Sequence, residues 1–321
     1  MLPTSFVSRK VTGPTSKAPI LGPGDRIGEG DCELVLDILP PDLADVAFDR
    51  LRKEVQWQTM HHRGGDVPRL VAVQGEVNAD GSIPIYRHPS DESPPLLPFS
   101  PTVSAIREQV QKILKHPVNH VLIQHYRGGA DYISEHSDKT IDIVRGSKIV
   151  NVSLGAQRVM TLRTKKDVAR AKQSVPASDN ASFASSDSQT GIKRETQKIP
   201  LPHNSMFVLG LETNRKWLHS INTDKRPEIT KSEAELFNNG ERISLTFRHI
   251  GTFLTADQSH IYGQGAKGKT KEDARPIVNG GAEAEKLIIG FGDENHRSDF
   301  DWDAAYGEGS DVLHCSPQSS Q

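Results

Sequence analysis

Short apolar stretches, each about the length of a β-strand, follow one another from Asn119 to Phe253 and are separated by turn-forming residues. They read "HVLIQHY", "IVNVSLG", "VMTLRT", "SMFVLGL" and "ISLTFRHI". Many short strands with turn signals between them are typical of a sandwich or a jelly roll, whereas a βαβ fold alternates strands with helices. The sequence therefore predicts a mainly β fold of this kind.

The last of these strands lies within "GERISLTFRH" and divides its side chains by type. Successive side chains of a strand point to opposite faces, so the apolar residues of this stretch share one face. The other face carries Arg242, Ser244, Thr246 and Arg248. A polar strand face usually points to water, but two arginines six positions apart would also line a pocket for a dianionic small molecule.

Helices are predicted on the N-terminal side of the strand block. Asp42–Val55 has apolar residues at helical spacing. The stretch "SPTVSAIREQVQKILKH" has the same pattern, with Ser100 before Pro101 as a helix N-cap. Residues 60–100 contain several Pro and Gly and predict loops with short strands. The expected fold class is α+β, mainly β with flanking helices.

Composition divides the chain into three expected parts. Residues 1–24 are rich in Ser, Thr and Pro and predict a flexible arm. Residues 25–255 form the predicted domain, interrupted at 173–191 by a polar segment that is expected to be a disordered insertion. Residues 256–321 are glycine-rich and acidic and are expected to be an extension appended to the domain.

Charge and cysteine content exclude several classes of protein. The net charge of −2 gives no overall basic excess, so bulk charge does not imply a nucleic-acid partner. Two cysteines are too few for a disulfide framework or a thiolate zinc site. No apolar run approaches the roughly 20 residues of a membrane helix. We expect an intracellular protein, cytoplasmic or nuclear, without a membrane partner; its oligomeric state is left open.

Three side chains are candidate metal ligands. His136 and Asp138 are two positions apart, so on a strand both point to the same side. His219 follows an apolar strand later in the chain and offers a third ligand. Two histidines and one carboxylate leave three positions open on an octahedral Fe(II), which suits an enzyme that binds a bidentate cosubstrate and then O₂. A closed structural zinc site usually has thiolates and is poorly supported.

The two arginines of "GERISLTFRH" fit the same chemistry. A 2-oxo acid bound to iron directs its second carboxylate away from the metal, and a fixed guanidinium binds a carboxylate through two parallel hydrogen bonds. Arg242 and Arg248 follow the last histidine in the sequence and could provide that guanidinium. This role would also explain a cationic strand face inside a β fold, where an unpaired charge is very costly.

The run "HYRGGADYISEHSD…VNVSLGAQRVMTLR…KIPLPHNSMFVLGLETNRKWLHSI…GERISLTFRH" resembles the AlkB-like family of Fe(II)/2-oxoglutarate dioxygenases, over about Val67 to Phe253. The resemblance implies a double-stranded β-helix, a jelly roll with iron at its open mouth. It implies that Fe(II), 2-oxoglutarate and O₂ take part and that ascorbate assists. The iron ligands that it implies are His136, Asp138 and His219.

The resemblance also assigns residues to the cosubstrate. Arg242 would grip the distal carboxylate of 2-oxoglutarate, and Arg248 would lie near its iron-binding end. Tyr126 matches a family tyrosine that touches the cosubstrate. Gln124 stands where the family usually has Asn. The implied chemistry is C–H hydroxylation, with release of succinate and CO₂, or oxidative N-dealkylation when the hydroxylated carbon is bonded to nitrogen.

Two residues bear on the substrate. Family members that repair bases usually carry an acid two positions past the ligand Asp, and here that position is Thr140. A hydroxyl cannot favour a cationic methylated base as a carboxylate does. Arg158 begins the basic stretch "RVMTLRTKKDVARAK", which could follow phosphates. We expect a small organic substrate, with alkylated nucleobases in DNA or RNA as the alternative.

Two further alternatives belong to other classes. "GQGAKGKT", residues 263–270, matches the P-loop pattern, but a phosphate site needs a buried strand before it and a helix after it. The preceding "ADQSHIY" has little apolar length, and Pro276 follows soon after. A catalytically inactive jelly roll used as a binding module is disfavoured because the three candidate ligands and both arginines are present.

Overall fold

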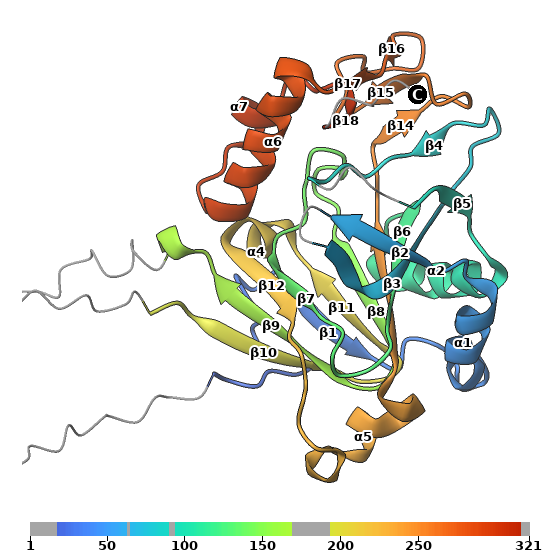
Figure 1. Cartoon of the computed structure of the whole chain (residues 1–321), viewed down its shortest axis with the longest axis vertical. Coiled ribbons are helices and arrows are strands. Elements are labelled where there is room, and N and C mark those ends of the chain that lie inside the picture. The colour runs from blue at the N-terminus through green and yellow to red at the C-terminus, as the bar shows by residue number, and fades with distance from the viewer. Residues whose placement is uncertain (1–17, 63–64, 90–93, 169–192, 316–321) are drawn as a thin grey trace, which may run out of the picture.

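The computed structural model describes residues 18–62, 65–89, 94–168 and 193–315. Most of the expected arm and the whole expected insertion, 173–191, lie outside the described residues. The described chain has a jelly-roll core, in which two largely antiparallel sheets face each other (Figure 1). This agrees with the predicted fold class.

The larger sheet has seven strands in one path, and an eighth strand pairs with one of them. Their order is β1 (Glu33–Leu36), β11 (Ser205–Leu209), β8 (Ile149–Gly155), β13 (Arg242–Arg248), β6 (His120–Tyr126), β3 (Gly65–Gly75) and β2 (Gln58–His62), and β5 (Leu96–Pro98) pairs with β3. The strand β13 is therefore central, with β6 and β8 hydrogen-bonded on its two sides.

The smaller sheet has four strands and covers the inner face of the larger one. Its order is β10 (Thr196–Leu201), β9 (Arg158–Thr164), β12 (Trp217–Ile221) and β7 (Ile133–His136). Apolar side chains of both sheets form one buried cluster, to which Phe207 and Leu162 belong. Helix α4 (Leu211–Lys216) connects β11 to β12.

Two helices cover the outer face of the larger sheet. They are α1 (Pro41–Glu54) and α2 (Pro101–Leu114), close to the bounds predicted from apolar spacing. They pack in one cluster with the apolar side chains of β13, so that strand is buried on both faces. Ser100 is the N-cap of α2 as predicted, but the carboxylate of Glu54 accepts hydrogen bonds from its hydroxyl and from the backbone N–H of Thr102.

The chain after β13 folds back over the mouth of the jelly roll (Figure 1). A third sheet has the order β16 (Arg275–Pro276), β15 (His260–Gly263), β14 (Thr252–Leu254) and β4 (Ile83–Pro84). The C-terminal elements are β17 (Val278–Asn279), α6 (Gly281–His296), α7 (Trp302–Tyr306) and β18 (Val312–His314). A 3-10 turn (Glu228–Thr230), α5 (Glu233–Leu236) and a second 3-10 turn (Phe237–Gly240) precede β13.

Arg87, which forms a buried ion pair with Asp142, joins this C-terminal segment to the rest of the molecule. Arg87 and Asp142 are almost fully buried and lie 2.7 Å apart. Arg87 also donates to the carbonyl oxygens of Gly265, Ser310 and Val312. The described part of 256–321 is thus integrated into the fold, which differs from the expected appendage. None of the helices among the described residues combines the length and apolar character required to span a membrane.

Candidate metal centre and cosubstrate site

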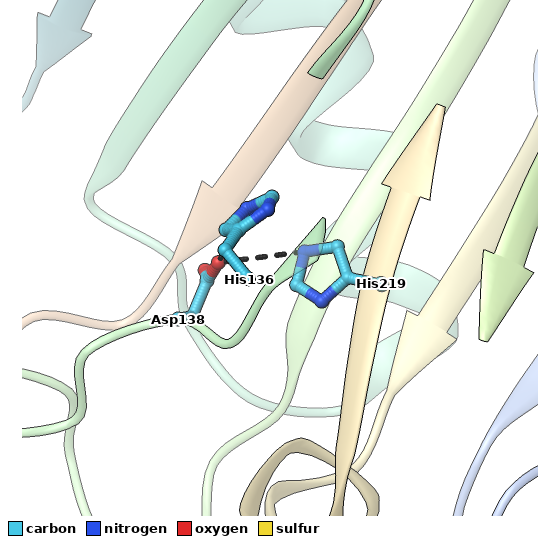
Figure 2. A group of neighbouring side chains, drawn as sticks. All are labelled: His136, Asp138 and His219. Atoms are coloured by element: carbon cyan, nitrogen blue, oxygen red, sulfur yellow. Dashed lines mark ion pairs between the residues drawn. The ribbon is translucent and has the colours of Figure 1, made fainter. Parts of the chain in front are cut away.

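His136 and His219 lie opposite each other on neighbouring antiparallel strands, β7 and β12. Their ring centroids are 4.2 Å apart. Asp138 follows the end of β7, and its carboxylate points toward the two rings (Figure 2). The structure therefore brings together the three ligands predicted from spacing.

The distances among these side chains suit one metal ion. Asp138 Oδ1 lies 3.8 Å from His136 Nε2 and 3.7 Å from His219 Nε2. One ligand atom from each residue can be chosen so that all three lie within 4.8 Å of one another. Ligand atoms about 2 Å from a common ion lie about 3–4 Å apart, so a small inward movement of these side chains would place all three on one ion. Two nitrogens and one oxygen on one side of an ion leave its other positions open, as in non-haem Fe(II) oxygenases.

The surroundings keep both histidines neutral. Burial lowers the pKa of His136, and burial together with the neighbouring His136 lowers the pKa of His219 to about 3. His136 Nδ1 is 2.8 Å from the carbonyl oxygen of Ser134, which accepts a hydrogen bond from Nδ1–H and leaves the Nε2 lone pair available to a metal. Neutral imidazoles are the form that binds metals.

Asp138 is held in its charged form by Arg248. Burial alone would raise the pKa of Asp138, but the charge of Arg248 and the hydrogen bond from it hold this pKa at about 2. Arg248 Nε donates to Asp138 Oδ2 at 2.8 Å, which leaves Oδ1 directed at the histidines. The backbone N–H and C=O of Asp138 bond to the side chain of Asn214, on α4. Sequence reasoning missed Asn214 because its contact depends on the fold.

Arg242 is almost fully buried, with 1% of its surface exposed. It nevertheless forms no ion pair with an acidic side chain among the described residues. Its Nη2 donates to Asn151 Oδ1 at 2.9 Å and to Ser153 Oγ at 2.7 Å. Its Nε and Nη1 have no hydrogen-bond partner. Burial lowers its pKa to about 10, and it therefore stays charged at neutral pH. A buried guanidinium with two free donors is the arrangement expected of a site for an anion.

The space between Arg242 and the metal ligands forms a pocket. Its polar lining includes all three metal-ligand candidates, and the cosubstrate candidates Gln124, Tyr126, Arg242 and Arg248. Tyr126 is 1% exposed, and its ring lies 5.2 Å from the Arg242 guanidinium carbon. With its amide oxygen turned toward Arg69, Gln124 accepts from Arg69 Nε at 2.7 Å. Arg69, on β3, was missed by sequence reasoning because nothing in its local sequence marks it.

A larger cavity of about 700 Å³ adjoins the centre and shares His136, Asp138 and Arg248 in its lining. Its walls are largely apolar and come from β3, β4, the segment 85–89, residues 94–96 and the C-terminal elements α6 and β18. Helix α6 contributes Ile288, Phe291 and Asn295. The volume is within the roughly 300–1,000 Å³ typical of small-molecule sites.

The two residues predicted on the substrate side are placed differently from the expectation. Thr140 is outside the cavity lining; its backbone N–H and hydroxyl both donate to the carboxylate of Glu294, on α6. Arg158 is buried and donates to the carbonyl oxygens of Gly128, Asp131 and Asn222. Its guanidinium therefore fastens two loops together and does not face a substrate.

The P-loop pattern at 263–270 is not built as a phosphate site. The next regular elements are the short strands β16 and β17, and the next helix, α6, begins only at Gly281, so no helix starts directly at the loop. Lys269 Nζ donates to the loop's own carbonyl oxygens at Gln264 and Ala266. The glycines have a packing explanation: a Cβ on Gly265 would lie 2.5 Å from Asp142 Oδ1 and 2.6 Å from Arg87 Nη2.

Comparisons with known proteins identify relatives. A family model described as the 2OG-Fe(II) oxygenase superfamily matches residues 31–248. DNA oxidative demethylase ALKBH2 of Homo sapiens is 29% identical over 214 residues, covering 64% of this chain and 69% of that protein. Alpha-ketoglutarate-dependent dioxygenase alkB homolog 3 of Bos taurus is 26% identical over 211 residues, covering 64% and 62%. A solved structure, "The structure of OsALKBH1", is 17% identical with a TM-score of 0.39, covering 68% of this chain and 98% of that one.

The matched range includes the strands β7, β12 and β13, which carry the candidate metal ligands and both arginines. It covers more than half of the chain, and both relatives named above are dioxygenases or demethylases of the AlkB type. The chain belongs to the 2OG-Fe(II) oxygenase superfamily, and it is an AlkB-like dioxygenase that uses Fe(II), 2-oxoglutarate and O₂.

Proposed function

We propose that this dioxygenase removes alkyl groups from alkylated nucleobases in DNA or RNA by oxidative dealkylation. The observation that carries the proposal is the position of the ligand triad on a cavity of about 700 Å³, in a chain whose relatives are named DNA oxidative demethylases. The sequence alone favoured a small organic substrate, with nucleobases as the alternative. The relatives support that alternative better.

In this proposal His136, Asp138 and His219 hold the iron. The pairing of β7 with β12 fixes the two imidazoles side by side, and the hydrogen bond to Ser134 orients one of them. Arg248 and Asn214 fix Asp138 from its carboxylate and its backbone, so a single oxygen remains for the metal. Such outer contacts orient the ligands of a metal site and tune its affinity.

Arg242 binds the distal carboxylate of 2-oxoglutarate. Its Nε and Nη1 are free and buried, while Asn151 and Ser153 hold the third nitrogen in place. The free Nη1 can donate to a carboxylate, which pairs a buried donor and neutralises the charge of the guanidinium. Tyr126 and Gln124 line the same pocket and fix the orientation of the bound molecule. Arg248 has a free Nη1 for the end of the cosubstrate nearer the iron.

When bound, Fe(II) with O₂ and 2-oxoglutarate supplies the oxidant that hydroxylates a C–H bond, with succinate and CO₂ as coproducts. The role of the cavity is to hold the alkylated nitrogen of the base with its alkyl carbon toward the open side of the triad. The apolar walls exclude water from the reacting carbon. A methyl group on nitrogen is thereby released as formaldehyde.

The proposal is tested with an oligonucleotide that carries one N-methylated base. The purified protein with Fe(II), 2-oxoglutarate and ascorbate is expected to form succinate, formaldehyde and the unmodified base in equal amounts. Asp138→Ala should form none of them. Conversion of 2-oxoglutarate to succinate without loss of the methyl group, on single-stranded and double-stranded DNA and RNA, would contradict the proposal.

A further inference from the structure

The charges on the wall of the larger cavity are mostly positive. Among the described residues that line it, the arginine and lysine side chains are those of Arg69, Lys139 and Arg248, and the only acid is Asp138. Arg248 neutralises Asp138 through two hydrogen bonds, and the same carboxylate is the proposed metal ligand. No carboxylate of the described lining is left to face a substrate cation.

Lys139 carries most of this argument because it directly follows Asp138 and borders the cavity. The structure gives its ammonium group one hydrogen-bond acceptor among the described residues, Asn295 Oδ1 at 3.4 Å. An ammonium group has three N–H donors. Nζ donates to no second acceptor among the described residues, so at least one of its N–H groups is available to an acceptor in the cavity that Lys139 borders.

The C-terminal segment fixes the position of Lys139. Asn295 of α6 accepts from Lys139 Nζ and from the backbone N–H of Ser137, and Tyr86 Oη accepts from the backbone N–H of Lys139. Helix α6 lies beyond the range matched by the family model, so this support belongs to a part of the chain that the match does not include.

The buried acid Glu294 does not change the positive charge of the cavity wall. Glu294 is buried and is absent from the cavity lining. Its carboxylate accepts from the backbone and hydroxyl of Thr140 and from Tyr306 Oη. Its charge interacts with that of Lys139, but because Glu294 is absent from the cavity lining, a base in the cavity meets Lys139 and not this carboxylate.

Alkylation makes some bases cationic and leaves others neutral. Methylation at N3 of cytosine gives a cation beside an amino group, whereas methylation at N3 of uracil leaves a neutral ring with carbonyl oxygens on both sides of the methylated nitrogen. The amino group of cytosine is a donor, and the corresponding oxygen of uracil or thymine is an acceptor. A cationic donor therefore repels the first base and binds the second.

Given the proposed function, we infer that the cavity selects an uncharged N-alkylated base with carbonyl oxygens beside the alkylated nitrogen, and that Lys139 donates to one of these oxygens. Lys139 is thus a specificity-determining residue, and Asn295 is its positioning residue. Bases that alkylation makes cationic are poor substrates.

Two oligonucleotides that differ only in one base, 3-methyluracil or 3-methylcytosine, test this inference. The ratio of kcat/KM for the first over the second is expected to be about ten or more, the usual size of a hydrogen bond to a charged group. A ratio of one or less would overturn the inference and leave base dealkylation standing. If neither base loses its methyl group while 2-oxoglutarate is still converted to succinate, the proposed function itself fails, and the inference with it.

Variants of Lys139 test whether this residue determines the ratio of kcat/KM for 3-methyluracil over 3-methylcytosine. In Lys139→Met the ratio should fall toward one, through a lower kcat/KM for 3-methyluracil, and in Lys139→Glu it should drop below one. Lys112→Met, on an exposed position of α2, is the matched control and should keep the wild-type ratio. A ratio that stays at the wild-type value in both Lys139 variants would overturn the role of Lys139.

Discussion

His136 and His219 are direct cross-strand partners in the smaller sheet, although they lie far apart in the sequence. Their strands are hydrogen-bonded through the backbone, so the sheet holds both imidazoles side by side. Asp138 follows β7 and is fixed by separate contacts to Arg248 and Asn214. A site whose ligands are each held by the fold needs little rearrangement to bind a metal.

Removal of one ligand should therefore abolish tight metal binding without unfolding the protein. We expect His219→Ala to weaken Fe(II) or Co(II) binding by more than about 100-fold, since loss of an outer contact alone typically weakens binding 10–100-fold. Equilibrium titration with the metal, together with circular dichroism, measures both effects. His116→Ala, which lies away from the triad on the loop after α2, is the control. Unchanged affinity in His219→Ala would contradict the proposed ligand set.

Arg242 should determine the affinity for 2-oxoglutarate. Arg242→Met keeps much of the side-chain length but removes the two free donors, and hydrogen bonds to charged groups contribute about 1.5–3 kcal/mol each. We expect the KM for 2-oxoglutarate to rise about 10- to 100-fold, measured by succinate formation. Arg163→Met, an exposed arginine on β9, should leave this KM unchanged. A KM within twofold of the wild-type value in Arg242→Met would contradict the assignment.

Alternation along a single strand was enough to predict which side chains of β13 share one face. In β13 the apolar side chains pack under the helices, and Arg242 and Arg248 point to the space between the sheets, as the two-residue period requires. The spacing of His136 and Asp138 was informative for the same reason. Local periodicity reports which side of a strand a residue occupies, and in a jelly roll one side of these strands faces the mouth.

The contacts that the sequence did not predict come from residues whose roles depend on distant parts of the chain. Asn214 and Arg69 have no local signal, because their partners Asp138 and Gln124 reach them only in the folded protein. Arg158 was misplaced because a basic stretch was interpreted as a surface, whereas its guanidinium is buried against carbonyl oxygens. The C-terminal segment is attached by an apolar cluster in which Leu287 and Phe291 pack with Ile141, and by the buried hydrogen bonds of Arg87, whose partners lie far away in the sequence.

The ionisable carboxyl group of Glu294 should make the free energy of unfolding depend on pH. The neutral amide of a glutamine at this position should not. Burial raises the pKa of Glu294, against the charge of Lys139 and the hydrogen bonds from Thr140. A carboxyl whose pKa is higher in the folded protein binds its proton more tightly there. Its contribution to stability is therefore complete below the pKa of the unfolded chain and is lost as pH rises through the folded pKa.

The comparison is between the wild type and Glu294→Gln, which has no ionisable group at this position. As pH rises from about 4 to 8, the free energy of unfolding of the wild type should fall relative to that of the variant. Each tenfold change in the ionisation constant corresponds to about 1.4 kcal/mol. Urea unfolding at several pH values measures the difference. A difference that stays constant or changes in the opposite direction would contradict the raised pKa.

Loss of Arg87 should be among the most destabilising single changes in this chain. Arg87 is 4% exposed and Asp142 is fully buried, so Arg87→Met would leave a carboxylate without its charge partner in the interior. It would also free the carbonyl oxygens of Gly265, Ser310 and Val312, which attach the C-terminal segment. Removing one partner of a buried ion pair typically costs about 3–5 kcal/mol.

Urea unfolding of Arg87→Met should show this loss, and Arg145→Met, whose side chain is exposed although it pairs with Asp303, should change stability by less than about 1 kcal/mol. Because Asp142 is the group left unpaired, adding Asp142→Asn should recover part of the stability lost in Arg87→Met. A loss below about 1 kcal/mol in Arg87→Met would mean that the C-terminal segment is attached by other contacts. Since α6 of this segment forms a wall of the cavity and positions Lys139, the same variant should also weaken base selection before it abolishes conversion of 2-oxoglutarate.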